Sequence, residues 1–147
     1  MTPYFLPPSS LVSALQAAAL RGVEVSVILP QESNQPLVHW ATRNVLRELL
    51  QYGVRISYRP PPFAHSKLFL VDDNYAIIGS ANLDPRSLRL NFELVIEVFD
   101  AAFVATMGEH FQQVKDITTE ETISGVDGRS LPARIRDAAA WLFSPYL

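Results

Sequence analysis

The sequence has no cysteine among its 147 residues. It therefore forms no disulfide, and it has no thiolate metal ligand or cysteine nucleophile. It also lacks the apolar run of about 18 residues that a membrane-spanning helix needs. Met1-Thr2-Pro3 has no basic start of the kind that opens a signal peptide. We therefore expect this chain to be soluble.

An overall excess of positive charge is absent too. The 12 Lys and Arg residues are outnumbered by 15 Asp and Glu residues, which gives a formal net charge of −3. This balance disfavours a generally basic nucleic-acid binder. Between Leu37 and Leu90, however, seven basic residues outnumber four acidic ones. The local excess suits an anionic substrate.

The composition predicts a packed core, because 48% of the residues are hydrophobic and only 18% are charged. The length fits one domain, which we assign to residues 1–147. In its first part the chain alternates helix and strand: a helix capped by Ser9 or Ser10 and stopped at Gly22, a strand at 23–29, a helix at 37–52 and a strand at 54–58. This alternation favours an α/β sandwich, with about five strands in a mixed, partly parallel sheet flanked by helices.

The second part continues with a hairpin. We predict strands at 67–71 and 75–78 joined by a turn at 72–74, a strand at 92–99, a helix at 101–114, a polar loop at 116–129 and a last helix at about 131–143. The last helix carries an apolar stripe, which we expect to pack in the core.

His65-Ser66-Lys67 is the most informative segment. On an extended chain, the side chains of His65 and Lys67 lie on the same side. A neutral imidazole can attack phosphorus or move a proton, and an ammonium can bind the non-bridging oxygens of a phosphate. A metal is disfavoured, because Lys67 puts positive charge beside the only candidate ligand. We therefore predict a phosphoryl-handling site that uses no metal or other cofactor.

Gly79-Ser80-Ala81-Asn82 follows closely and adds further groups to this set. The amide of Asn82 can also bind phosphate oxygens. Gly79 and Ser80 have small side chains, so their backbone N–H groups can approach a phosphate closely. We therefore assign Asn82 to the catalytic set, and Gly79 and Ser80 to substrate binding.

Three further charged residues complete the predicted site. Asp72 faces away from Lys67 on an unbroken strand, so we give it a supporting role in the turn. Glu93 is expected to hold the far imidazole nitrogen of His65 and to fix its tautomer. Arg86 is a candidate contact for a phosphate or lipid headgroup. The alternatives are a carboxylate paired with a surface arginine for Glu93, and solvated surface charge for Arg86.

These residues carry a resemblance. The segment His65-x-Lys67-x4-Asp72-x6-Gly79-Ser80-x-Asn82 resembles the signature of the phospholipase D superfamily. The extension from Asn82 to Glu93 is similar to that of bacterial cardiolipin synthases. Upstream, Tyr4-Phe5-Leu6-Pro7 is similar to the start of the second catalytic half of those enzymes. The resemblance covers nearly the whole chain and weakens only at about 116–130.

The resemblance implies a phospholipase D-like fold, with an active site assembled from two such motifs in one chain or in two copies. One histidine attacks phosphorus to give a phosphohistidine, and the other protonates the leaving alcohol. This chain holds one motif, so its implied partner is a first catalytic half or a second copy of itself. Beside a first half, His65 has the acid–base role. In a symmetric dimer, the two copies of His65 take both roles.

The implied activity is phosphatidyl transfer of the cardiolipin synthase type. Its implied substrate is phosphatidylglycerol or a similar anionic phospholipid, at the cytoplasmic membrane surface for the full-length enzyme. One alternative is a homodimeric phosphodiesterase or nuclease with one motif per chain, which the acidic balance counts against. Another is a folded but inactive excised domain, with exposed apolar surface where its missing half would pack.

Overall fold

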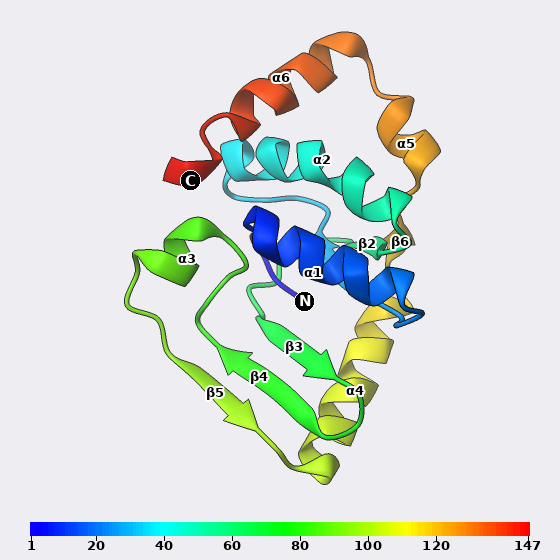
Figure 1. Cartoon of the computed structure of the whole chain (residues 1–147), viewed down its shortest axis with the longest axis vertical. Coiled ribbons are helices and arrows are strands. Elements are labelled where there is room, and N and C mark those ends of the chain that lie inside the picture. Colours follow the sequence, from blue (N-terminus) through cyan, green and yellow to red (C-terminus); the bar gives the residue numbers. More distant parts are fainter.

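Two three-stranded β-sheets organise the computed structural model, which describes all residues 1–147 (Figure 1). The first sheet has the order β1-β2-β6 and the second the order β3-β4-β5. Their strands are β1 (Ser26–Pro30), β2 (Arg55–Arg59), β3 (Leu68–Val71), β4 (Tyr75–Gly79), β5 (Val95–Val98) and β6 (Thr119–Glu120). Strands β1 and β2 are parallel, whereas the other pairs are antiparallel. The predicted α/β class with mixed, partly parallel pairing is confirmed.

An extended N-terminal segment, residues 1–6, runs between the two sheets. The backbone N–H of Thr2 donates to the carbonyl of Ile28 in β1 at 3.3 Å, and that of Leu68 in β3 donates to Met1 at 3.0 Å. The prediction of one sheet of about five strands is therefore wrong, since two smaller sheets meet through this segment. Proline at position 3 has no N–H to donate, so the segment forms only part of a ladder.

The four long helices lie where the sequence predicts them, three of them over the sheets and the last against another helix (Figure 1). They are α1 (Ser9–Leu20), α2 (Pro36–Gln51), α4 (Ala101–Lys115) and α6 (Leu131–Trp141). Helix α1 is followed, after Arg21, by Gly22 with φ of +90°, as expected of a left-handed stop. The serine cap is wrong, because Pro8 occupies the cap position and no side chain caps α1. No helix combines the length and the apolar character needed to cross a membrane.

Three short helical elements, in addition to strand β6, were not predicted. They are α3 (Pro85–Arg89), α5 (Ile123–Asp127) and the 3₁₀ turn η1 (Ser144–Tyr146). Residues 116–129, expected to be a loop, contain both β6 and α5. Side-chain caps explain two of these elements: Asp84 accepts from Ser87 N at 2.7 Å, and Thr122 accepts from Gly125 N at 2.9 Å. Strands β1 and β5 each begin three residues later than predicted.

The largest core cluster lies between the helices α1 and α2 and the parallel strands. Leu46, Leu49 and Ile56 are fully buried there, and Phe5 from the N-terminal segment is 1% exposed. Parallel strands covered by helices need such continuous apolar packing. The core therefore holds the first sheet and the N-terminal segment in one unit.

Helix α6 turns a different face to the core than the sequence predicts. Its apolar stripe is exposed: Leu131 is 66% exposed and Ile135 is 61% exposed. Asp137 instead is 2% exposed and forms ion pairs with Arg129 and Arg136. Ala140, also buried, permits close packing on α2, beside which α6 lies (Figure 1). The prediction that the apolar stripe packs in the core is therefore wrong. Hydrophobic periodicity does not reveal that Asp137, buried together with two arginines, can face the neighbouring helix.

Removing the Asp137 carboxylate should destabilise the fold strongly. In Asp137→Ala, Arg129 stays mostly buried, at 18% side-chain exposure, without its anion. We expect the free energy of unfolding to fall by about 3–5 kcal/mol in urea titrations. The matched control is Asp127→Ala, which removes only an exposed ion pair with Arg47 and should cost less than about 1 kcal/mol. Equal losses in the two variants would contradict this account.

The pH dependence of stability should report His39, on α2. Burial first, and then the positive charge of Arg43, lower the pKa of His39 to about 4 from 6.5. Between these values the unfolded chain binds a proton that the folded chain does not, so stability falls as the pH decreases through that window. Urea unfolding at neutral and acidic pH should show a smaller loss in His39→Gln than in the original chain. His110→Gln, at an exposed position, should retain the original loss.

Candidate functional site

His65 and Lys67 meet in the extended segment that leads into β3. The Lys67 Nζ lies 3.0 Å from the His65 Nδ1 and donates to the His65 carbonyl at 3.0 Å. His65 is exposed and Lys67 is half-buried. The structure thus brings these two predicted residues into direct contact.

The electrostatics of this pair favour an uncharged imidazole. Partial desolvation, followed by the charge of Lys67, lowers the pKa of His65. Desolvation also lowers the pKa of Lys67, although the carboxylates of Glu93 and Asp84 oppose that effect. A neutral imidazole beside a cation is the form that can accept a proton or attack phosphorus.

Asn82 lies just after β4 and is held by helix α3. Its Nδ2 donates to Ser87 Oγ at 3.2 Å, while its buried Oδ1 has no hydrogen-bond partner. Ser87 is fixed in turn by the Asp84 cap of α3. The amide orientation is therefore set by a short helix that was not predicted, although the Asp84-Pro85 pair that opens it is a recognisable start signal.

Glu93 does not contact His65 within this chain, so the predicted orienting bond is absent here. Its carboxylate accepts a short hydrogen bond from Ser80 Oγ and another from Asn91 Nδ2 at 3.3 Å. These bonds, led by that from Ser80, lower the pKa of Glu93. Ser80 directly follows β4 and Glu93 lies two residues before β5, so the pairing of these strands places the Ser80 hydroxyl beside the carboxylate.

Gly79 and Ser80 have structural duties that the sequence did not reveal. A Cβ at Gly79 would lie 2.8 Å from the Cα of Val95, so the close approach of β5 requires glycine there. The Ser80 backbone N–H donates to the Leu94 carbonyl at 2.9 Å. That N–H is thus engaged with β5 in this chain, whereas the assignment of Gly79 and Ser80 to substrate binding stays a prediction.

Asp72 and Arg86 lie at the margins of the set. Asp72 begins the turn after β3, at the opposite end of that strand from His65, and has φ of +49°. This left-handed position fits the supporting turn role, since aspartate tolerates it better than most residues. Arg86 is exposed on α3, which agrees with both of the roles considered for it.

Two aromatic residues beside His65 were missed. The rings of Tyr4 and Phe63 each lie 5.9 Å, centroid to centroid, from the imidazole. Phe63 had a signal, because it precedes His65 by two residues and so shares its side of an extended chain. Tyr4 had none, because it is far from His65 in sequence.

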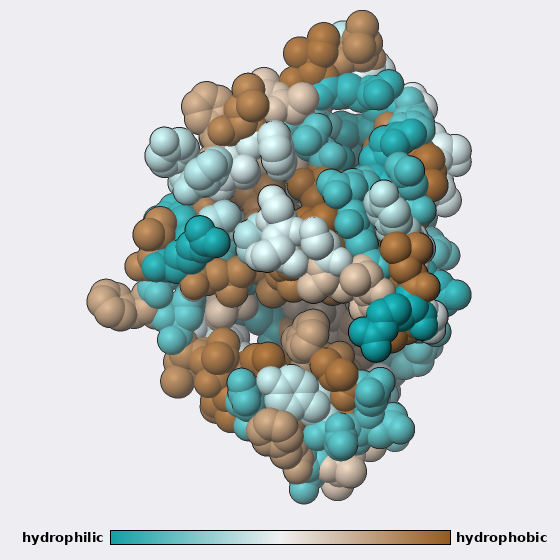
Figure 2. Space-filling model, viewed as in Figure 1, coloured by the Kyte–Doolittle hydropathy of each residue, from teal (hydrophilic) through white to brown (hydrophobic).

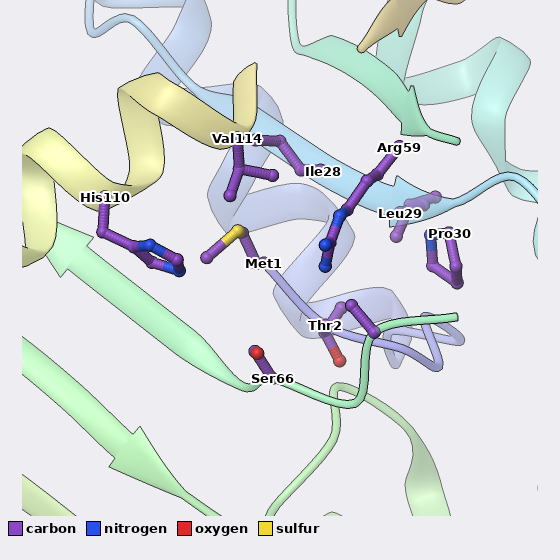
Figure 3. Close-up of a pocket in the computed structure, with 10 residues that line it drawn as sticks. Met1, Thr2, Ile28, Leu29, Pro30, Arg59, Ser66, His110 and Val114 are labelled. Atoms are coloured by element: carbon purple, nitrogen blue, oxygen red, sulfur yellow. The ribbon is translucent and has the colours of Figure 1, made fainter. Parts of the chain in front are cut away.

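A small cavity lies behind the site rather than in it. Arg59, Ser66 and His110 line it together with Met1 and apolar residues of β1 (Figure 3). His65 and Lys67 are not among its lining residues, and His65 is exposed at the surface. No group of three or more His, Asp or Glu side chains in the structure is arranged to hold a metal ion.

Comparison with known sequences identifies relatives of the whole chain. Residues 1–115 match the family model described as "Cardiolipin synthase, PLD-like domain". The chain is 37% identical over 146 residues to the cardiolipin synthase of Oceanobacillus iheyensis, and 39% identical over 150 residues to cardiolipin synthase A of Serratia proteamaculans. Each alignment covers 99% of this chain but 30% of the relative. The chain therefore spans less than a third of the length of these relatives.

Solved structures share the fold. Phosphatidylserine synthase of Haemophilus influenzae matches with a TM-score of 0.77 and 18% identity, over 99% of this chain and 40% of that chain. Nuc of Salmonella typhimurium, a phospholipase D family member, matches with a TM-score of 0.71 and 22% identity, over 83% and 80%. With the fold and the family model in agreement, the chain belongs to the cardiolipin synthase, phospholipase D-like domain family.

Proposed function

We propose that this chain supplies one half of the active site of a phosphatidyltransferase of the cardiolipin synthase type. The observation that carries the proposal is the contact between His65 and Lys67, 3.0 Å apart on an open surface, in a chain of this family. The substrate is phosphatidylglycerol or a similar anionic phospholipid. Residues 1–147 act as one domain, which builds its half of the site on β3 and on the end of β4.

The reaction consists of two displacements at phosphorus. A histidine of the other half attacks, so that a P–N bond forms while the P–O bond to the first alcohol breaks. His65 gives that alcohol a proton and takes one in return from the Lys67 ammonium 3.0 Å away. A second alcohol then transfers its proton to His65 and attacks phosphorus, which releases the histidine. In a symmetric dimer, the partner copy of His65 is the nucleophile.

The remaining residues have distinct parts in this scheme. Lys67 and Asn82 bind the non-bridging oxygens, whose charge they stabilise in each transition state. Ser80 and Glu93 form a bonded pair that holds the rim of the site, with Gly79 allowing β5 to approach. Asp72 supports the hairpin turn, and Arg86 is available to the headgroup. The scheme needs no metal or organic cofactor.

The other half of the site packs on an exposed apolar edge made by α3, β5 and their connection. Leu90 is 69% exposed, Phe92 fully exposed and Leu94 71% exposed. Figure 2 shows apolar side chains along this edge. A patch of this kind beside an open catalytic pair is typical of an interface. A first catalytic half, or a second copy of this chain, is the partner that we propose for it.

Association with the cytoplasmic membrane belongs to the full-length enzyme in this proposal. Its substrate is a membrane lipid, and the reacting phosphate lies at the membrane surface. Arg86 and Arg89, both exposed on α3, give that side of the site a positive charge that suits an anionic surface.

A second candidate function is a homodimeric phosphodiesterase or nuclease. One observation favours it: the likeness to Nuc covers 80% of that chain, so the two are similar in size. The net charge of −3 disfavours a nucleic-acid substrate. Binding to DNA with a steep salt dependence would favour this alternative.

Loss of His65 should abolish phosphatidyl transfer. The assay uses a chimera in which this chain replaces the matching segment of the Oceanobacillus iheyensis cardiolipin synthase, with labelled phosphatidylglycerol as substrate. Relative to the unmutated chimera, we expect His65→Ala to reduce cardiolipin formation about 100- to 10,000-fold, because acid–base catalysis at the leaving alcohol is lost.

The matched control is His110→Ala, which removes an exposed histidine of α4 outside the set. This variant should keep the activity of the chimera. Near-normal synthesis by His65→Ala would refute the assignment. The same lipid assay on the isolated chain tests self-assembly, where any His65-dependent product indicates pairing of two copies.

The apolar edge should make the isolated chain associate. We expect its sedimentation coefficient to rise with concentration, because packing the edge removes Phe92 and Leu94 from water. The double variant Phe92→Ser/Leu94→Ser should shift the chain towards monomer. Val23→Ser, at an apolar position 52% exposed near the start of β1, is the control and should not. A chain that stays monomeric and binds no hydrophobic dye would contradict this role of the edge.

A further inference from the structure

The imidazole of His65 is bordered by two aromatic rings that contact one another as well. The Tyr4 ring meets it edge-on, with centroids 5.9 Å apart and planes at 78°, and the Phe63 ring lies 5.9 Å away at 54°. The centroids of Tyr4 and Phe63 are 6.3 Å apart. All three distances lie in the range of favourable aromatic pairs, so the three rings form one cluster.

The Tyr4 ring is fixed at both ends. Its hydroxyl donates to Asn34 Oδ1 at 2.7 Å, in the loop between β1 and α2. Its backbone is held by the next residue, because Phe5 is 1% exposed and its carbonyl accepts from Thr42 Oγ1 at 2.8 Å. Pro3 is buried as well. On this extended segment the buried neighbours face the core, whereas Tyr4 faces His65.

Lys67 acts on the imidazole at one nitrogen only. An ammonium group can donate but not accept, so the Nδ1 that lies 3.0 Å from Lys67 Nζ accepts its hydrogen bond. The proton of the neutral ring is then on Nε2. No side chain or backbone group of this chain makes a hydrogen bond to Nε2. Lys67 is the charged group that acts on His65, and Tyr4 is the other titratable side chain that contacts its ring.

We propose that Tyr4 is a positioning residue for His65. With Phe63, it holds the imidazole against Lys67, so that Nδ1 stays occupied as an acceptor and Nε2–H points to the open side of the site. In the proposed transfer reaction, on which the catalytic part of this inference rests, Nε2–H gives its proton to the leaving alcohol while Nδ1 takes one from the Lys67 ammonium, so that the ring stays neutral. A ring free to rotate would offer this proton in fewer of its orientations.

Core packing alone does not account for Tyr4. Its side chain is only half-buried, and its hydrogen bond with Asn34 lies at the surface. Phe5, its neighbour, is the member of this segment that joins the main core cluster. An exposed hydrogen bond of this kind contributes little to stability, but it fixes the direction of the ring.

Nitrogen-15 NMR of the isolated chain tests the proposal without any need for turnover. The original chain should show His65 as a single Nε2–H tautomer at neutral pH. In Tyr4→Leu, the Nδ1–H tautomer should appear, and the pKa of His65 should rise towards its ordinary value, because water replaces the ring. Asn34→Ala and Tyr4→Phe, which keep the ring but lose its hydrogen bond, should give smaller changes in the same direction.

Two comparisons keep the result interpretable. Tyr52→Leu, at an exposed tyrosine after α2 that is 40% exposed, should leave His65 unchanged. If Tyr4→Leu does not fold, Phe63→Leu serves in its place, with the same expectation for tautomer and pKa. An unchanged tautomer and pKa in the folded ring-deletion variant would overturn the proposal.

Activity separates this proposal from the proposed function. In the chimera described above, we expect Tyr4→Leu to lower kcat about 10- to 100-fold with little change in KM, since orientation rather than binding is lost. A raised KM with an unchanged kcat would overturn the catalytic part of the proposal. If the NMR changes occur but the original chimera makes no cardiolipin, the proposed function fails while the positioning of His65 stands.

Discussion

The extended segment at residues 1–6 is the constraint on which both the fold and the site depend. Leu68, which directly follows Lys67, donates its backbone N–H to this segment at 3.0 Å. Leu83, which directly follows Asn82, pairs with it in a parallel bridge. The pairing of β3 with β4, which sets Leu68 opposite Ile78, fixes the distance between the two halves of the motif. The N-terminal segment then joins both halves to the first sheet through its bond with Ile28.

The same segment links the stability of the core to the geometry of the site. Phe5 is buried among the helices and parallel strands, whereas Tyr4, one residue earlier, contacts His65. Because adjacent side chains of an extended chain point in opposite directions, a change that unseats Phe5 also moves Tyr4. Loss of core packing at Phe5 therefore changes the contact between Tyr4 and His65, as expected where a site is built on a rigid scaffold.

Local patterns were sufficient for the long helices, the β3–β4 hairpin and the contact between His65 and Lys67, because each depends on residues close in sequence. Long-range features were not predictable in the same way. The division into two sheets depends on where the N-terminal segment lies, and the face of α6 depends on ion pairs that bury Asp137. Glu93 pairs with Ser80 because β4 and β5 lie side by side there, and the spacing of residues in the sequence does not predict this strand pairing.

Because His65 is exposed, packing of a partner on this chain would change the electrostatics of the site. In this chain, desolvation already lowers the pKa of both His65 and Lys67, although His65 stands at an open surface. In the proposed assembly, a partner packed on the neighbouring apolar edge removes more water from both groups, which strengthens their interactions with a phosphate and further favours the neutral imidazole. In the proposed reaction, it also limits the access of water to the phosphohistidine. Under this proposal the partner surface, rather than the motif in this chain, determines whether an alcohol or water takes the phosphatidyl group.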